Sequence, residues 1–188
     1  MKYKPTEKIL FVDRDGVINK YPGNFKYVTS WSSFKFLPGV KKALKKLNNA
    51  GFKIFIISNQ AGVSKGLYSQ KALDKLTRRM LLGIESYGGK ISGVYYCIHR
   101  DIDKCSCRKP KPGLIKKALK EHGFARSPLK NTYMIGDSIR DIQTGKNAGC
   151  RTILVLSGRD KLKDKRSWQI QPDFIAKNLL NATDILLS

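Results

Sequence analysis

The chain has 188 residues, of which 41% are hydrophobic and 27% charged, values ordinary for a globular protein with a substantial core. No apolar run reaches the length of a membrane span, and residues 1–5 lack a signal-peptide hydrophobic region, so we expect a cytoplasmic protein without membrane association. The formal net charge is +23, but 27 of the 37 basic residues are lysines spread along the chain. Such a solvated lysine-rich surface predicts only non-specific attraction to nucleic acid.

Apolar segments of strand length alternate with segments of helical periodicity along the chain. In chain order, we predict a strand at 9–12, a long loop at 19–36, a helix at 38–50, a strand at 53–58, a helix at 69–87, a strand at 93–99, a helix at 112–121, a strand at 132–135, a helix at 139–148, a strand at 152–156, a short edge strand at 172–175 and a helix at 178–187. This alternation predicts a three-layer, Rossmann-like α/β fold, in which helices cover both faces of a parallel sheet. The length favours a single domain over residues 1–188.

The first predicted strand ends abruptly in two carboxylates, Asp13 and Asp15. Residues i and i+2 of a strand point the same way, so both side chains could share one site at the strand's carboxyl end. Two close acids repel each other unless a cation lies between them or one is protonated. The pair is therefore a candidate metal site, acid/base pair, or nucleophile beside an acid. The alternative is a strand that ends in a solvated turn, where Asp and Gly are common.

Polar residues also follow three other predicted strands. They are Ser58, a lysine-containing loop before Pro112, and Asp137. Neighbouring parallel strands would collect these groups at one edge of the sheet, beside Asp13 and Asp15.

These four motifs, in this order, resemble those of the haloacid dehalogenase superfamily of phosphotransferases. The matching segments are Asp13-Arg14-Asp15-Gly16, Ser58, a lysine before Pro110 or Pro112, and Gly136-Asp137 with Asp141. The resemblance implies hydrolysis of phosphate monoesters. Asp13 would be the nucleophile that forms an aspartyl-phosphate, and Asp15 would be the general acid and base.

The resemblance also implies a catalytic Mg²⁺. Its ligands would be the carboxylates of Asp13 and Asp137 and the backbone carbonyl of Asp15. Ser58 and Lys109 would hold the transferring phosphoryl group, and Asp141 would support the site from behind. Both Lys109 and Lys111 are available for the lysine motif, and the family match places Lys109 on the phosphoryl group.

Further segments resemble the heptose 1,7-bisphosphate phosphatases within this superfamily. These segments are Ser58-Asn59-Gln60-Ala61-Gly62, Tyr95-Tyr96-Cys97-x-His99, and Cys105-x-Cys107-Arg108-Lys109-Pro110-Lys111-Pro112-Gly113. The likeness implies a small phosphorylated sugar or similar metabolite as the substrate, and removal of the 7-phosphate of D-glycero-D-manno-heptose 1,7-bisphosphate. It places Arg108, Asn59, Gln60 and Ser138 in substrate binding. Many members carry a lysine where this chain has Ser138, so one phosphate contact is either absent here or supplied by another cation such as Lys65.

Three other functions fit parts of the sequence. A histidinol-phosphate phosphatase shares the chemistry and many of the motifs. A nucleic-acid 3′-phosphatase would account for the net charge, with residues 161–166 as its best basic patch, but no base-stacking motif is evident. A zinc-stabilised binding module would leave Asp13, Asp15 and Asp137 without a purpose.

Three of the four cysteines and one of the two histidines lie within eleven residues. Cys97, His99, Cys105 and Cys107 have the spacing C-x-H-x₅-C-x-C. Three thiolates and one imidazole suit a closed tetrahedral Zn²⁺ site, so we predict a structural zinc loop at 97–107. The alternative is a set of unrelated thiols on a mobile loop. Cys150, next to a predicted strand, is expected to be a small buried apolar residue.

No large insertion separates the motifs, so we expect no large cap domain and a pocket shaped by loops 19–36, 62–69 and 99–110. We also expect a monomer. Because the zinc loop leads directly into Arg108 and Lys109, zinc would fix the backbone that aims both cations.

Overall fold

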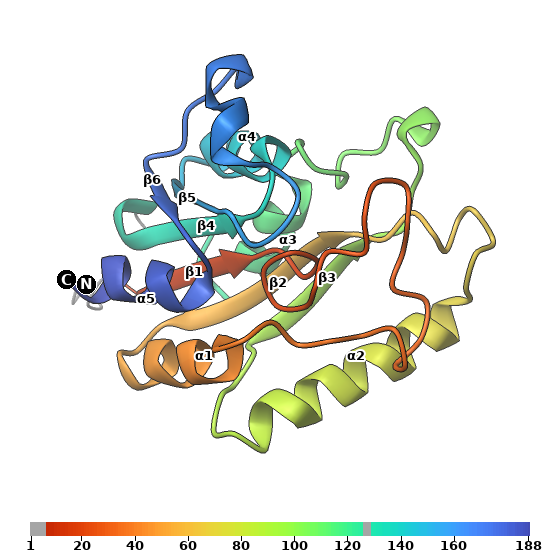
Figure 1. The fold of residues 1–188 in the computed structure, drawn as a ribbon, viewed down its shortest axis with the longest axis horizontal. Helices are drawn as coiled ribbons and strands as arrows, with labels where there is room; N and C mark the ends of the chain where they lie inside the picture. The colour runs from red at the N-terminus through yellow and green to blue at the C-terminus, as the bar shows by residue number, and fades with distance from the viewer. Residues whose placement is uncertain (1–6, 126–128) are drawn as a thin grey trace.

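A computed structural model describes residues 7–125 and 129–188. Its centre is a six-stranded sheet in the order β3-β2-β1-β4-β5-β6, and every neighbouring pair is parallel (Figure 1). The strands are β1 (Ile9–Val12), β2 (Lys53–Asn59), β3 (Gly93–Cys97), β4 (Thr132–Gly136), β5 (Arg151–Val155) and β6 (Phe174–Ala176). The predicted parallel α/β sheet is confirmed, and β1 lies between β2 and β4.

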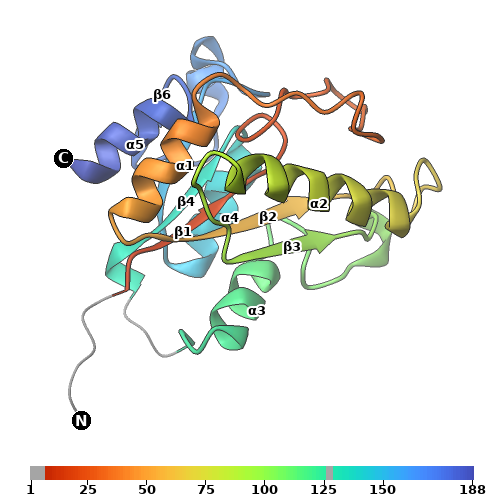
Figure 2. The same cartoon turned by 90° about the horizontal axis from the view of Figure 1, so that it is seen from below.

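Helices cover both faces of this sheet, as predicted. They are α1 (Val40–Asn49), α2 (Gln70–Glu85), α3 (Gly113–Glu121), α4 (Ile139–Ala148) and α5 (Leu179–Leu187). Figure 2 shows α1, α2 and α5 on one face and α3 on the other. Side-chain alternation along β1 explains this arrangement. Leu10 and Val12 pack in the core with α1, α2 and α5, whereas Ile9 and Phe11 pack in the core with α3.

Local signals place the helix ends close to their predicted positions. Ser69 is the N-cap of α2, and its hydroxyl accepts a hydrogen bond from the Ala72 N–H at 3.1 Å. Asn178 caps α5 in the same way through the Asn181 N–H. The predicted strand at 93–99 ends earlier, at Cys97. The chain turns there into the loop that carries Cys105 and Cys107, which we call the cysteine-rich loop.

Within the described residues, three short 3₁₀ helices were not predicted. They are Asp101–Asp103, Leu129–Asn131 and Leu162–Ser167. The last one contains most of the basic segment 161–166. Helices of one or two turns have little periodicity of their own, so a hydrophobic pattern does not reveal them.

The connections around the sheet's carboxyl edge are loops without a large cap. Residues 13–39 and 60–69 contain no α-helix or named β-strand. None of the helices within the described residues is both long and apolar enough to cross a membrane.

Candidate active site

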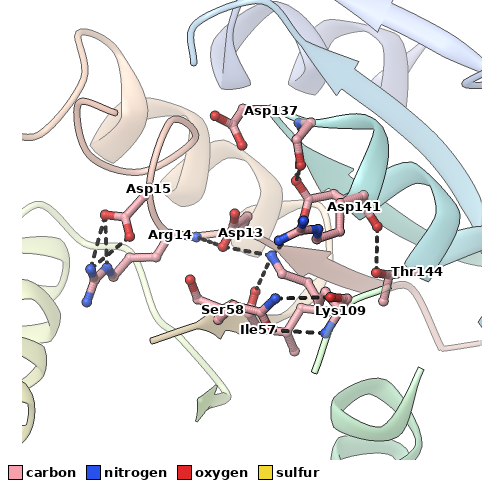
Figure 3. Close-up of polar contacts among 12 residues, drawn as sticks. Asp13, Arg14, Asp15, Ile57, Ser58, Lys109, Asp137, Asp141 and Thr144 are labelled. Carbon is pink, nitrogen blue, oxygen red and sulfur yellow. Dashed lines mark hydrogen bonds and ion pairs between the residues drawn. The ribbon is translucent and has the colours of Figure 1, made fainter. Parts of the chain in front are cut away.

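Asp13 lies directly after β1, at the centre of the sheet's carboxyl edge. Its backbone N–H donates to the Ile135 carbonyl at 3.0 Å, which continues the pairing with β4 past the end of β1. Its Oδ1 accepts hydrogen bonds from the Arg14 N–H at 2.7 Å and from Lys109 Nζ at 3.0 Å (Figure 3). The carboxylate is therefore held in place by its own turn and by a buried cation.

Lys109 occupies the middle of the acidic cluster. Its ammonium group lies 3.0 Å from Asp13, 2.5 Å from Asp141 and 3.3 Å from the Ile57 carbonyl, and its side chain is only 3% exposed. Burial would lower the pKa of Lys109, but the charges of Asp13 and Asp141 outweigh it and raise the pKa above its usual value. Lys109 therefore stays charged, as its predicted role beside a phosphoryl dianion would require.

The structure distinguishes the two candidate lysines. Lys111 Nζ donates to the carbonyl oxygens of Cys105 at 2.7 Å and Lys104 at 3.1 Å, so it ties down the cysteine-rich loop instead of reaching the acids. Lys109 alone of the two reaches Asp13, and its predicted contact with the phosphoryl group stays a prediction.

Asn59 holds the backbone of Lys109. Its Nδ2 donates to the Lys109 carbonyl at 3.1 Å, and its Oδ1 accepts the Lys109 N–H at 3.0 Å. The side chain lines the pocket, but both ends of its amide are occupied by this contact. Asn59 therefore has an observed role in positioning Lys109, which the predicted substrate contact did not anticipate.

Ser58 and Gln60 lie beside Asp13 and Asp15. Gln60 Nε2 donates to Ser58 Oγ at 3.2 Å and to Asp15 Oδ2 at 3.1 Å, and its Oε1 accepts from the Tyr68 hydroxyl at 2.6 Å. Gln60 is 1% exposed and links the end of β2 to the first motif. Its predicted substrate contact stays a prediction, and so does the phosphoryl contact of Ser58.

The Asp15 carboxylate turns away from Asp13 toward Arg14 (Figure 3). Arg14 Nη2 donates to both carboxylate oxygens, at 3.1 and 2.9 Å, and Asn19 Nδ2 adds a hydrogen bond at 2.8 Å. Burial raises the pKa of Asp15, but the charge of Arg14 and these hydrogen bonds outweigh it and lower the pKa. Asp15 is therefore held ionised in this state.

Sequence reasoning gave no role to Arg14, which is fully buried. Its Cζ lies 5.8 Å from the centre of the Tyr96 ring, so the cation packs against an aromatic face as well as against Asp15. The sequence did contain a signal for this role, because Arg14 stands between two acids in a motif that follows a buried strand. Tyr96, on the edge strand, completes its surroundings.

Asp137 follows β4, and its carboxylate occupies space that is open because Gly16 and Gly158 have no side chain. An added Cβ at Gly16 would lie 2.0 Å from Asp137 Oδ2, and one at Gly158 would lie 1.9 Å from it. The Arg159 N–H donates to the same oxygen at 2.7 Å. The loop after β5 thus forms one wall of the site, a contribution that the four motifs did not indicate.

Asp13, Asp137 and Asp141 bring carboxylate oxygens within 4.8 Å of one another, and all three residues are buried. Burial and the charges of Asp141 and Asp13 raise the pKa of Asp137 well above its usual value. Lys109 supplies one positive charge to this group of three acids. The remaining negative charge and the oxygen donors fit Mg²⁺, so the residues present suit the predicted metal.

Ser138 and Asp141 form the amino-terminal cap of α4. The Ser138 hydroxyl donates to Asp141 Oδ2 at 2.5 Å, and the Ser138 N–H donates to the same oxygen at 3.2 Å. The other Asp141 oxygen contacts Lys109. Asp141 therefore connects the α4 cap to Lys109, and it is also one of the three acids that could hold a metal ion. Its expected supporting role and the predicted substrate contact of Ser138 stay predictions.

The predicted zinc ligands lie together beyond β3. Cys97 Sγ is 3.6 Å from Cys105 Sγ, 3.2 Å from Cys107 Sγ and 3.7 Å from His99 Nδ1. Ligands at 2.3 Å around a tetrahedral zinc are about 3.8 Å apart, so this cluster is close to the size of such a site. The sulfur distances are far too long for disulfides. The donor set fits structural Zn²⁺.

The pocket over these groups has a volume of about 340 Å³. All three loops predicted to shape it contribute residues, as do the start of α4 and Arg159. Arg108 lies in its wall and pairs with Asp101 through Nε at 2.5 Å and Nη2 at 3.2 Å.

Cys150 lies outside this site. It is 4% exposed in the core, as expected for a small buried apolar residue.

The sequence and the fold both match known phosphatases. The D-glycero-β-D-manno-heptose-1,7-bisphosphate 7-phosphatase of Helicobacter pylori is 38% identical over 170 residues, which cover 90% of this chain and 94% of that protein. The chain belongs to this family of haloacid dehalogenase-like phosphatases. The enzyme of the same name from Haemophilus ducreyi is 36% identical, over 81% of this chain and 85% of the relative.

Further comparisons agree with this membership. The profile of the HAD-hydrolase-like family matches residues 106–182. The crystal structure of D,D-heptose 1,7-bisphosphate phosphatase from B. bronchiseptica, complexed with magnesium and phosphate, superimposes with a TM-score of 0.86 at 28% identity. The match covers 96% of this chain and 98% of that one. The phosphatase activity and the fold predicted from the sequence are thus confirmed.

Proposed function

We propose that this phosphatase removes the 7-phosphate of D-glycero-D-manno-heptose 1,7-bisphosphate through an aspartyl-phosphate at Asp13. The buried contact of 3.0 Å between Lys109 and Asp13, beside Asp137, carries the mechanistic proposal. A dianionic phosphoryl group needs a nucleophile and positive charge at the same point. The names of the relatives support the choice of sugar.

Asp13 is suited to attack because its position leaves it little freedom. The backbone bond to β4 and the contacts of Oδ1 with Arg14 and Lys109 fix one carboxylate oxygen, so the other can face the pocket. In-line attack of that oxygen on phosphorus would form the acyl phosphate and release the sugar alkoxide. Lys109 and the Ser58 hydroxyl would hold the phosphoryl oxygens during transfer.

Asp15 would protonate the leaving alkoxide and then remove a proton from the water that hydrolyses the intermediate. In the described structure Arg14 stabilises its ionised form. A bound phosphate dianion adds negative charge nearby, which favours protonation of a carboxylate. We infer that Asp15 gains its proton only once substrate is present.

Two metal ions complete the proposal. The carboxylates of Asp13 and Asp137 and the backbone carbonyl of Asp15 would hold Mg²⁺, which when bound neutralises charge on the phosphoryl oxygens. Zn²⁺ held by the cluster of Cys97, His99, Cys105 and Cys107 would be structural, because the four ligands leave no open position.

Phosphate release from a substrate panel with Mg²⁺ tests the proposal. The panel contains heptose 1,7-bisphosphate, histidinol phosphate, fructose 1,6-bisphosphate and a 3′-phosphorylated oligonucleotide. We expect the heptose bisphosphate to have the highest kcat/KM by at least about tenfold. A higher value for histidinol phosphate or for the oligonucleotide would replace the proposed substrate. Turnover near the wild-type rate in Asp13→Asn would rule out the covalent mechanism.

A further inference from the structure

Three cations line the pocket together with one carboxylate, Asp101. Lys65 comes from the loop between β2 and α2, Arg108 from the end of the cysteine-rich loop, and Arg140 from the first turn of α4, and all three line the pocket with Asp101. The hydrogen bond from Arg108 and the charges of Arg140 and Lys65 lower the pKa of Asp101. These four residues, which we call the Asp101 rim, carry three positive formal charges against one negative charge.

Arg108 is fixed on the Asp101 rim with donors to spare. Its Nε and Nη2 donate to Asp101, and its Nη1 donates to the His99 carbonyl at 3.2 Å. A guanidinium has five N–H groups, so two remain for a ligand. Because His99 belongs to the metal cluster, Arg108 is held by the loop that the zinc would stabilise.

Arg140 is the unengaged cation of the rim. In the described part of the chain its guanidinium makes no ion pair or hydrogen bond, and only its backbone carbonyl is used, by Thr144 at 2.7 Å. Its side chain is exposed at the pocket. It lies between Asp137 and Asp141 in the helix turn that begins at the acidic cluster. Its guanidinium is therefore available to an anion bound in the pocket.

Two other cations line the mouth of the pocket. Arg159 lies 3.9 Å from Asp160, so their formal charges cancel, and Lys26 is a single cation from the loop between β1 and α1. A second phosphate on a substrate would be attracted more strongly to the Asp101 rim, with its surplus of two positive charges.

We propose that Arg140 is a specificity-determining residue that binds the distal phosphate of a bisphosphate substrate together with Arg108. This inference rests on the proposed function, since it assumes that one phosphate reacts at Asp13 while the other needs cations of its own. Asp101 keeps the guanidinium of Arg108 in place for this contact. Two guanidinium groups can hold one phosphate through several charge-assisted hydrogen bonds.

The test compares matched mono- and bisphosphates in wild type and Arg140→Gln. The pairs are heptose 7-phosphate with heptose 1,7-bisphosphate, and fructose 6-phosphate with fructose 1,6-bisphosphate. We expect Arg140→Gln to lower kcat/KM for the preferred bisphosphate about ten- to a hundredfold, mainly through KM, and to leave monophosphates nearly unchanged. Arg78→Gln, an exposed arginine on α2 outside this pocket, is the control with the same change in charge.

The outcomes separate this inference from the proposed function. If wild type prefers heptose bisphosphate and Arg140→Gln keeps that preference, the inference fails and the function stands. The same failure, with a large selective loss in Arg159→Gln, would move the distal site to Arg159. If wild type prefers another bisphosphate and Arg140→Gln loses that preference, the heptose assignment fails and the inference stands. A wild-type enzyme without preference in either pair would overturn both.

Discussion

Replacing Asp13 by Asn should abolish turnover but stabilise the magnesium-free protein at neutral pH. Burial is the largest influence on Asp13, and the net result, despite the charge of Lys109, is a pKa raised from 3.8 to about 6. At about 1.36 kcal/mol per pKa unit, ionised Asp13 costs the folded state roughly 3 kcal/mol. Asn has the same shape, carries no charge and can still accept the Arg14 hydrogen bond.

The sign follows from proton linkage. Between pH 3.8 and about 6 the folded protein binds more protons at Asp13 than the unfolded chain, so this group's contribution to stability is lost as pH rises. The Asp13→Asn variant has no ionisable group at this position, so it keeps this contribution to stability at every pH. Its advantage should be about 3 kcal/mol at pH 8 and roughly half of that at pH 5. For a chain of this size, the larger value corresponds to an increase in Tm of about 6–12 °C.

Thermal unfolding in magnesium-free buffer at pH 5 and pH 8 measures both values. Asp15→Asn is the matched control with the opposite expected sign, because Arg14 holds the pKa of Asp15 below its ordinary value. Loss of that charge-assisted pair should lower stability by about 1.5–3 kcal/mol. A Tm for Asp13→Asn equal to or below wild type at pH 8, or a gain that does not change with pH, would refute this reasoning.

Three further predictions concern the supports of the site. Gly158→Ala would place a Cβ 1.9 Å from Asp137 Oδ2, so the Mg²⁺ concentration for half-maximal activity should rise at least about tenfold, and an unchanged value would contradict the assigned ligand. Cys107→Ser should reduce bound zinc below one per chain by elemental analysis and lower Tm; full zinc retention would exclude this cluster as the site. Asn59→Ala removes both bonds to the Lys109 backbone and should lower kcat about tenfold with little change in KM; a rise in KM alone would favour a direct substrate contact.

The fold could be predicted from the sequence because its signals are local. The uninterrupted apolar run at 9–12, the N-cap at Ser69 and the alternation of strands with helices each depend on residues a few positions apart. Parallel strands gather their carboxyl ends at one edge of the sheet, so the sequence alone was enough to place Asp13 and Asp137 together. The close spacing of the three cysteines and one histidine of the candidate zinc site was equally local.

The contacts that complete the site join residues distant in sequence, and only the tertiary structure decided them. Which lysine reaches Asp13 depends on how the cysteine-rich loop turns, and Asn59 meets Lys109 across fifty positions. The Ser157 hydroxyl reaches the Gly16 carbonyl across 141 positions, which brings the loop after β5 against Asp137. Strand order and loop path set these distances. A periodic pattern specifies which element forms, but it carries no information about which loop ends beside which carboxylate.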